Sequence, residues 1–111
     1  MKKRVLSGIK PTGGLTLGNY IGALKPWVDT QYDGENLYMI ADLHAVTVPQ
    51  DPTAMRDATF ELVAAYVAAG LDTKKNTFFV QSHVSAHAEL GWLLTCQARM
   101  GWLSLMTQFK D

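Results

Sequence analysis

The sequence predicts an α/β fold whose parallel sheet is the first half of a doubly wound architecture. Three short apolar runs alternate with segments whose apolar residues recur at helical spacing, and this alternation is typical of βαβ units. The middle run, 37–41, is almost entirely apolar, as expected for a strand that is covered on both faces. A glycine-rich turn separates the first run from the first helical segment. The expected architecture is therefore Rossmann-like.

The first strand is expected at Arg4–Ile9, and the helix that follows it at about Gly18–Gln31. Pro26 lies inside this helical segment and lacks an amide N–H, so it should kink or restart the helix. The helical segment is recognised by its spaced apolar side chains, which are Tyr20, Ile21, Leu24, Trp27 and Val28.

The second strand is expected at Leu37–Ala41 and ends at Asp42. A long helix should follow, because Asp51 and Pro52 form a favourable helix start and Gly70 a favourable stop. Its expected apolar face consists of Met55, Thr59, Leu62, Val63 and Tyr66.

The third strand is expected at Thr77–Gln81. A last helix should run from about Ser85, acting as its cap, to Arg99. Gly101 is expected to separate that helix from a final turn over Leu103–Gln108.

Composition fits one domain, because 111 residues with 48% hydrophobic content can bury a core. The single cysteine, Cys96, has no partner within the chain, and no apolar leader is recognisable, so a cytoplasmic location is expected. No run reaches about 18 apolar residues, so no membrane span is expected. The end at Phe109, Lys110 and Asp111 carries no structural stop signal, which leaves open that residues 1–111 are a truncated part of a longer protein.

The charge distribution points to an anionic ligand. The net charge is zero, yet residues 1–28 carry no acidic side chain and hold five basic ones, Lys2, Lys3, Arg4, Lys10 and Lys25. The turn Pro11–Asn19 lies in this basic segment, and the first N–H groups of the next helix would face its ligand, so a phosphate is the expected guest. The turn matches neither the dinucleotide fingerprint nor a P-loop.

Candidate ligand-binding residues follow the three expected strands, because ligands bind beyond the carboxyl ends of such sheets. The turn could instead be an ordinary strand-to-helix connection. Asp42 could instead cap a loop, and His44 could be a partly buried histidine of the core. His83 and His87 are four residues apart, with Glu89 close behind, and this spacing invites a metal interpretation. No third ligand lies at a spacing that is recognised for zinc sites, so no metal site is expected. The residues of the three segments are Lys10, Thr12, Thr16 and Asn19, then Asp42 and His44, then Gln81, Ser82 and His83.

Five segments in order resemble one known family. Thr16-Leu17-Gly18-Asn19 stands where class I aminoacyl-tRNA synthetases carry their HIGH signature, and this variant is similar to the bacterial-type tryptophanyl-tRNA synthetase family. The resemblance covers nearly the whole chain and is carried by 7–13, 18–24, 42–47, 79–84 and 106–111.

The resemblance implies activation of tryptophan by ATP, with Mg²⁺ carried by the nucleotide, and transfer of the tryptophanyl group to tRNA(Trp) by a homodimer. It implies Thr16 and Asn19 as catalytic residues. It implies ATP contacts from Lys10, Pro11, Thr12, Gly18 and Asn19, and tryptophan contacts from Leu6, Gly8, Asp42, His44 and Gln81. It also makes Trp92, Leu93, Cys96 and Trp102 core or interface residues.

Leu6, Lys10 and Leu105 depart from the family's usual residues, and each could retune the pocket. Under the resemblance, residues 1–111 form the N-terminal part of the catalytic domain. Two alternatives stay open at this point. The chain could be a non-catalytic fragment or subunit, or part of a related nucleotidylyltransferase with another acceptor.

Overall fold

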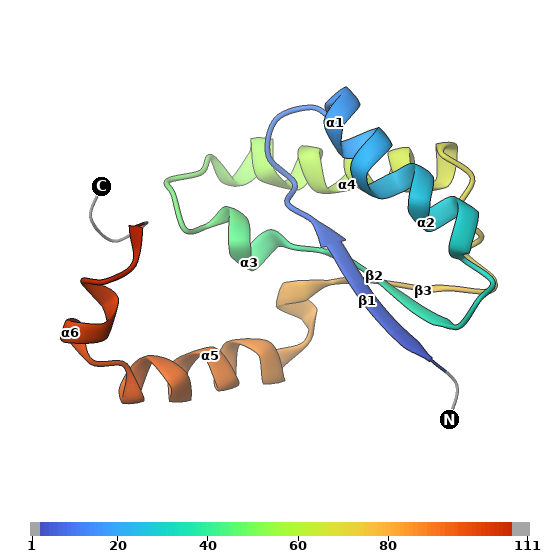
Figure 1. Ribbon diagram of the computed structural model, residues 1–111. Helices are drawn as coiled ribbons and strands as arrows, with labels where there is room; N and C mark the ends of the chain where they lie inside the picture. Colours follow the sequence, from blue (N-terminus) through green and yellow to red (C-terminus); the bar gives the residue numbers. More distant parts are fainter. Residues whose placement is uncertain (1–2, 108–111) are drawn as a thin grey trace.

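A computed structural model describes residues 3–107 and contains a three-stranded parallel sheet in the order β1-β2-β3 (Figure 1). The strands are β1 (Arg4–Ile9), β2 (Glu35–Ile40) and β3 (Thr77–Val80). Gly8 pairs with Met39, and Met39 pairs with Phe79, so these three residues form one row across the sheet. The parallel sheet and the expected first strand are confirmed.

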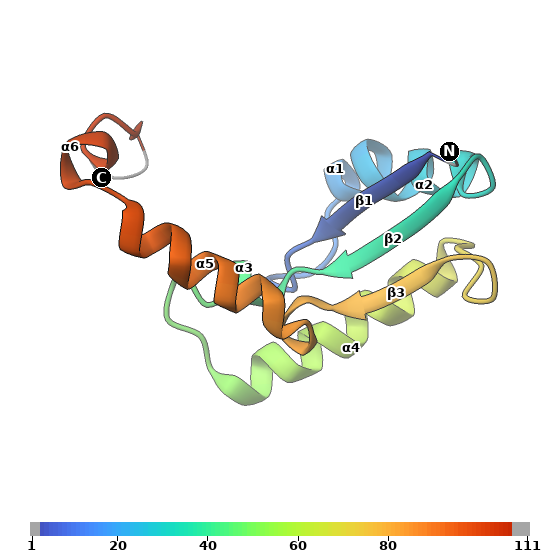
Figure 2. The same cartoon turned by 90° about the horizontal axis from the view of Figure 1, so that it is seen from below.

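The helices that connect the strands lie on one face of the sheet. The first connection contains α1 (Leu17–Asn19), the π-helix η1 (Tyr20–Leu24) and α2 (Lys25–Thr30), and the second contains α4 (Pro52–Ala68). Figure 1 shows α1, α2 and α4 above the sheet, and Figure 2 shows α5 running away from the carboxyl ends of the strands. This arrangement leaves the opposite face of the sheet largely uncovered by residues 3–107.

The core lies between the sheet and these helices. Tyr38 and Tyr66 are its largest buried side chains, and Trp27 stacks on Tyr38 at a ring-centroid distance of 5.1 Å and meets Tyr66 edge-on at 5.5 Å. The buried cluster consists of Leu24, Tyr38, Ile40, Leu62, Tyr66 and Leu71. The sequence-predicted apolar face of α4 therefore packs as expected, with Leu62 and Tyr66 at its centre.

Pro26 marks a local change in helix geometry. Directly before it, the N–H of Lys25 donates to the carbonyl of Tyr20, a π-helical bond, and α2 then begins at Lys25. The wider turn keeps the proline ring from the carbonyl four residues earlier, with which it would clash in a regular α-helix. The expected restart is confirmed, within a helical run that starts at Leu17.

The start of α4 is capped as the sequence predicts. Asp51 accepts a hydrogen bond from the N–H of Ala54 at 2.8 Å, and Pro52 occupies the first helical position. Gly70, with φ of +103°, follows the helix in the left-handed region, where a side chain would be strained.

Replacing Asp51 with alanine is expected to lower the free energy of unfolding by about 1 kcal/mol, because one N–H at the helix start loses its acceptor. Urea unfolding checks this value. The variant Asp51→Ser should stay close to wild type, since its hydroxyl oxygen can accept the same bond. Equal losses in the two variants would contradict the capping role.

Beyond the second and third strands, the chain forms short helices that the sequence analysis did not predict. They are α3 (Asp42–Ala45) and the 3₁₀ turn η2 (Gln81–His83), so β3 ends one residue earlier than expected. Because α3 is a single turn without apolar periodicity, nothing in the sequence pattern distinguishes it from a loop.

Three expectations for the C-terminal part are corrected. α5 spans Ser85–Gln97, but its N-cap is Val84 and Ser85 makes no capping bond, because the chain enters α5 directly from η2. Gly101 lies inside α6 (Met100–Leu103) and does not separate helices, since the break falls at the extended residues Ala98 and Arg99. The final turn begins after α6, at Ser104, and its expected end at Gln108 lies outside the described residues.

α5 and α6 bury none of their residues within the described chain. Trp92 is 69% exposed and Trp102 61%, and Leu93 and Cys96 are also exposed, so these residues are not core here. Within residues 3–107, no helix combines the length and apolar character needed to cross a membrane.

Candidate functional site

A cleft of about 470 Å³ opens where the chain leaves β1. One wall is the glycine-rich turn with the start of the first helical run, and the other is α4. Its lining residues are Gly8, Ile9, Lys10, Pro11, Thr12, Gly13, Gly14, Leu15, Asn19, Ala23, Ala58, Glu61, Leu62 and Ala65. The predicted turn therefore does line a cavity.

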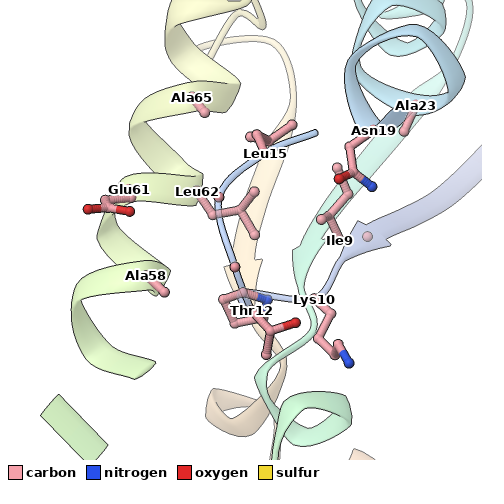
Figure 3. Close-up of a pocket in the computed structure, with 14 residues that line it drawn as sticks. Ile9, Lys10, Thr12, Leu15, Asn19, Ala23, Ala58, Glu61, Leu62 and Ala65 are labelled. Atoms are coloured by element: carbon pink, nitrogen blue, oxygen red, sulfur yellow. The ribbon is translucent and has the colours of Figure 1, made fainter. Parts of the chain in front are cut away.

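Figure 3 shows how the two walls face each other. Leu62 and Ala65 of α4 lie across from Leu15 and Asn19, so the α4 wall is mainly small and apolar. The carboxylate of Glu61 lies on the far side of α4 from Asn19. A flat apolar group fits the α4 wall, and a polar group fits the turn.

Thr16 and Asn19 form a reciprocal capping box at the start of α1. The Thr16 hydroxyl donates to Asn19 Oδ1 at 2.8 Å, the Thr16 N–H donates to the same oxygen at 3.1 Å, and the Asn19 N–H donates to Thr16 Oγ1 at 3.2 Å. The carboxamide oxygen of Asn19 is thus used internally. Its Nδ2 group donates to no other residue within 3–107, so it is free to bind a ligand.

The turn also presents backbone donors. Among the described residues, the N–H groups of Gly13, Gly14 and Leu15 have no hydrogen-bond acceptor, and Gly13 adopts φ of +63°, a conformation that favours glycine. Successive free N–H groups in a turn form a concave donor surface that suits anions. Pro11 is buried and anchors the base of this turn.

Lys10 supplies positive charge to the cleft. It follows directly on β1, is half-buried, and forms no ion pair with any residue described here. In Figure 3 its ammonium group points away from the α4 wall. A ligand phosphate or carboxylate at the mouth of the cleft would therefore lie within the reach of an unpaired cation.

Tyr66 holds the end of β1 against β2 immediately below the cleft. Its hydroxyl accepts from the N–H of Ile9 at 3.2 Å and donates to the carbonyl of Met39 at 3.3 Å. The side chain is fully buried, and this desolvation raises the pKa of Tyr66 to about 12. The neutral hydroxyl thus fixes the point from which Lys10 and the turn emerge.

The predicted tryptophan-contacting residues lie outside this cleft, except Gly8. Asp42 and Gln81 stand at the carboxyl ends of neighbouring strands, where α3 contacts η2, and His44 is exposed on α3. Leu6, 55% exposed, lies on the same strand as Gly8, two residues away. The oxygen Oε1 of Gln81 is buried and lacks a hydrogen-bond donor, so it has an unfilled place for a ligand N–H group.

His83 and His87 are separated by the helix start, as the sequence predicts. His83 belongs to η2 and is exposed, whereas the ring of His87 packs against Phe79 at a centroid distance of 6.1 Å. Within residues 3–107, no group of three His, Cys, Asp or Glu side chains is arranged to hold a metal ion.

The structure thus brings Lys10, Pro11, Thr12 and Asn19 together in one cleft, whereas Thr16 and Gly18 are not among its lining residues. The α4 wall was not predicted from the sequence, although Ala58 and Ala65 are seven residues apart and therefore share one face of the helix. The sequence signal that could have predicted this wall is the spacing of these small residues beside the apolar face of α4.

Comparison with known families decides how this site is interpreted. Residues 1–111 match the family of class I tRNA synthetases for tryptophan and tyrosine. The chain belongs to this family. It is 56% identical over 110 residues to the tryptophan–tRNA ligase of Clostridium tetani and 52% identical over 111 residues to that of Wolinella succinogenes. These alignments cover 99% and 100% of the chain but 32% and 34% of the two ligases.

Solved structures of this family share the fold. The chain superposes on tryptophanyl-tRNA synthetase from Mycoplasma pneumoniae with a TM-score of 0.90 and 39% identity, over 99% of this chain and 32% of that one. The Campylobacter jejuni enzyme in complex with ADP and tryptophan gives a TM-score of 0.82 at 38% identity, over 92% of this chain and 32% of that one. The chain therefore spans about a third of the relatives it matches.

Proposed function

We propose that the protein containing this chain is a tryptophan–tRNA ligase. Tryptophan and MgATP react to give tryptophanyl-adenylate and pyrophosphate, and the tryptophanyl group then passes to tRNA(Trp). The observation that carries the proposal is the identity of 52–56% with tryptophan–tRNA ligases along the whole chain. We include in the proposal a homodimeric state, which the family resemblance implies, and a cytoplasmic location, which the composition leads us to expect.

In this proposal the tryptophan carboxylate attacks the α-phosphorus of ATP. The transition state gains charge on the phosphate oxygens, and Asn19 Nδ2, the free N–H groups of the turn and Lys10 stabilise that charge. Gly18, without a side chain, lets the adenosine approach the helix start. Catalysis then depends on positioning and charge stabilisation, and no residue of the chain acts as a nucleophile.

The tryptophan side of the site is assigned to Leu6, Gly8, His44 and Gln81. Support comes from the unfilled acceptor of Gln81, which suits an ammonium group, and from the row of Gly8 and Met39 on the uncovered sheet face. A Cβ at Gly8 would lie 2.7 Å from the carbonyl oxygen of Met39, so the neighbouring strand leaves no room for a side chain at this position.

Pyrophosphate–ATP exchange tests the proposal. In a full-length enzyme containing these residues, tryptophan should stimulate exchange and tyrosine should not, whereas the isolated 111-residue chain should show negligible exchange, because its cleft supplies one cation for a triphosphate. Stimulation by a different acceptor would indicate a nucleotidylyltransferase. No exchange with any acceptor would indicate a non-catalytic protein.

A further inference from the structure

Asp42 is the charged residue most deeply placed at the carboxyl edge of the sheet. Its exposed fraction is 7%, and it directly follows the buried residues Ile40 and Ala41. No described cation forms an ion pair with it. A buried carboxylate in such a place needs hydrogen-bond donors to offset its lost hydration.

Backbone groups provide those donors. Oδ1 of Asp42 accepts from the N–H of Leu43 at 3.0 Å and from the N–H of Ser82 at 2.9 Å. The first bond fixes the start of α3. The second crosses to the middle of η2, forty residues away in sequence.

The bond to Ser82 begins where the strand ladder stops. The pairing of β2 with β3 ends at Ile40 and Val80, and beyond that point the chain turns into α3 on one side and η2 on the other. α3 carries His44, and η2 carries Gln81. The Asp42 side chain therefore links the backbones of the two elements that carry these residues, directly beyond the last strand pair.

We infer that Asp42 is a positioning residue that holds α3 and η2 in register, and that it acts on tryptophan through His44 and Gln81 without itself binding the ammonium group. This inference rests on the proposed function. A positioning role for Asp42 differs from a direct contact with the ammonium group of tryptophan in one physical respect. Positioning requires an acceptor oxygen at Oδ1, whereas an ammonium contact requires a negative charge.

Asparagine separates the two roles, because its carboxamide oxygen can accept both backbone bonds without carrying charge. In a full-length enzyme, Asp42→Ala should lower kcat/KM for tryptophan in pyrophosphate exchange by roughly tenfold to a hundredfold, as expected for loss of hydrogen bonds to a charged acceptor. Asp42→Asn should recover most of that loss. Thermal unfolding of both variants controls for folding, and KM for ATP should change less than KM for tryptophan.

If Asp42→Asn is as impaired as Asp42→Ala while both remain folded, charge is required and the inference is overturned. If both variants match the wild type, the connection has no role and the inference is likewise overturned. Absence of tryptophan-dependent exchange in the wild-type enzyme would instead refute the proposed function. If Asp42→Ala does not fold, recovery of folding and of kcat/KM in Asp42→Asn supports the inference, and an Asn variant that folds but has lost its kcat/KM overturns it.

Discussion

Replacement of Asn19 by alanine is expected to slow formation of tryptophanyl-adenylate by roughly tenfold to a hundredfold while tryptophan affinity changes little. Nδ2 of Asn19 is free and lines the cleft, so it can donate to phosphate oxygens that gain charge in the transition state. A hydrogen bond to a charged group contributes about 1.5–3 kcal/mol, which gives this change in rate. Pre-steady-state measurement of adenylate formation is the appropriate test.

Asn19→Asp serves as the matched control. The aspartate keeps an oxygen for the two bonds from Thr16, so the capping box stays intact, but it removes the donor and adds a negative charge beside the phosphates. We expect it to be slower than Asn19→Ala. An alanine variant with unchanged rate and weakened tryptophan affinity would mean that the turn binds a different ligand.

Thr16 is expected to act through Asn19. Its hydroxyl proton is directed to Asn19 Oδ1, so Thr16 orients the carboxamide and presents Nδ2 to the cleft. Thr16→Ala should therefore slow the wild-type enzyme but cost little in the Asn19→Ala background. The double variant loses less than the product of the single effects when two residues act as a unit.

How much of this site the sequence could predict depends on the kind of signal. The first strand and α4 were predicted closely because alternation, Asp51 and Gly70 are local features. The Thr16–Asn19 pair was also visible, since a threonine three residues before an amide at a helix start is the pattern of a capping box. The resemblance implies a catalytic role for both residues, and the structure adds the bond between them.

The remaining features are nonlocal. The Asp42–Ser82 bond joins residues forty positions apart, and the α4 wall of the cleft forms only when the helix packs against the turn. α5 could be predicted as a helix, yet its exposed apolar surface says nothing about which residues cover it. Family resemblance added residue roles that no spacing in the chain could supply.

The free energy of unfolding is expected to fall by roughly 1–3 kcal/mol when Tyr66 is replaced by phenylalanine. The ring remains, so no large cavity forms, but the N–H of Ile9 and the carbonyl of Met39 each lose a buried partner. Both groups keep their places in the β1–β2 ladder, so the loss is that of two ordinary hydrogen bonds, at about 0.5–1.5 kcal/mol each. Urea unfolding at neutral pH measures the difference.

The pH dependence gives Tyr66 a separate signature. Because burial raises its pKa from 10.0 to about 12, the folded state keeps the proton that the unfolded state releases. The stabilising contribution of the protonated Tyr66 hydroxyl is therefore fully present below pH 10 and is lost as the pH rises toward 12. The free energy of unfolding falls by about 2–3 kcal/mol over this range, at 1.36 kcal/mol per pKa unit. Tyr66→Phe should lack this loss.

Tyr38→Phe is the control for this pH window, because burial also raises the pKa of Tyr38. The Tyr38 hydroxyl donates to the carbonyl of Trp27 at 3.3 Å, away from the cleft. The Tyr38→Phe variant should retain most of the alkaline loss that Tyr66→Phe abolishes. It should also leave the end of β1 in place, so adenylate formation should slow in Tyr66→Phe and not in Tyr38→Phe. An alkaline profile of Tyr66→Phe identical to that of the wild type would show that the Tyr66 hydroxyl is already hydrated, and that the turn is held by other contacts.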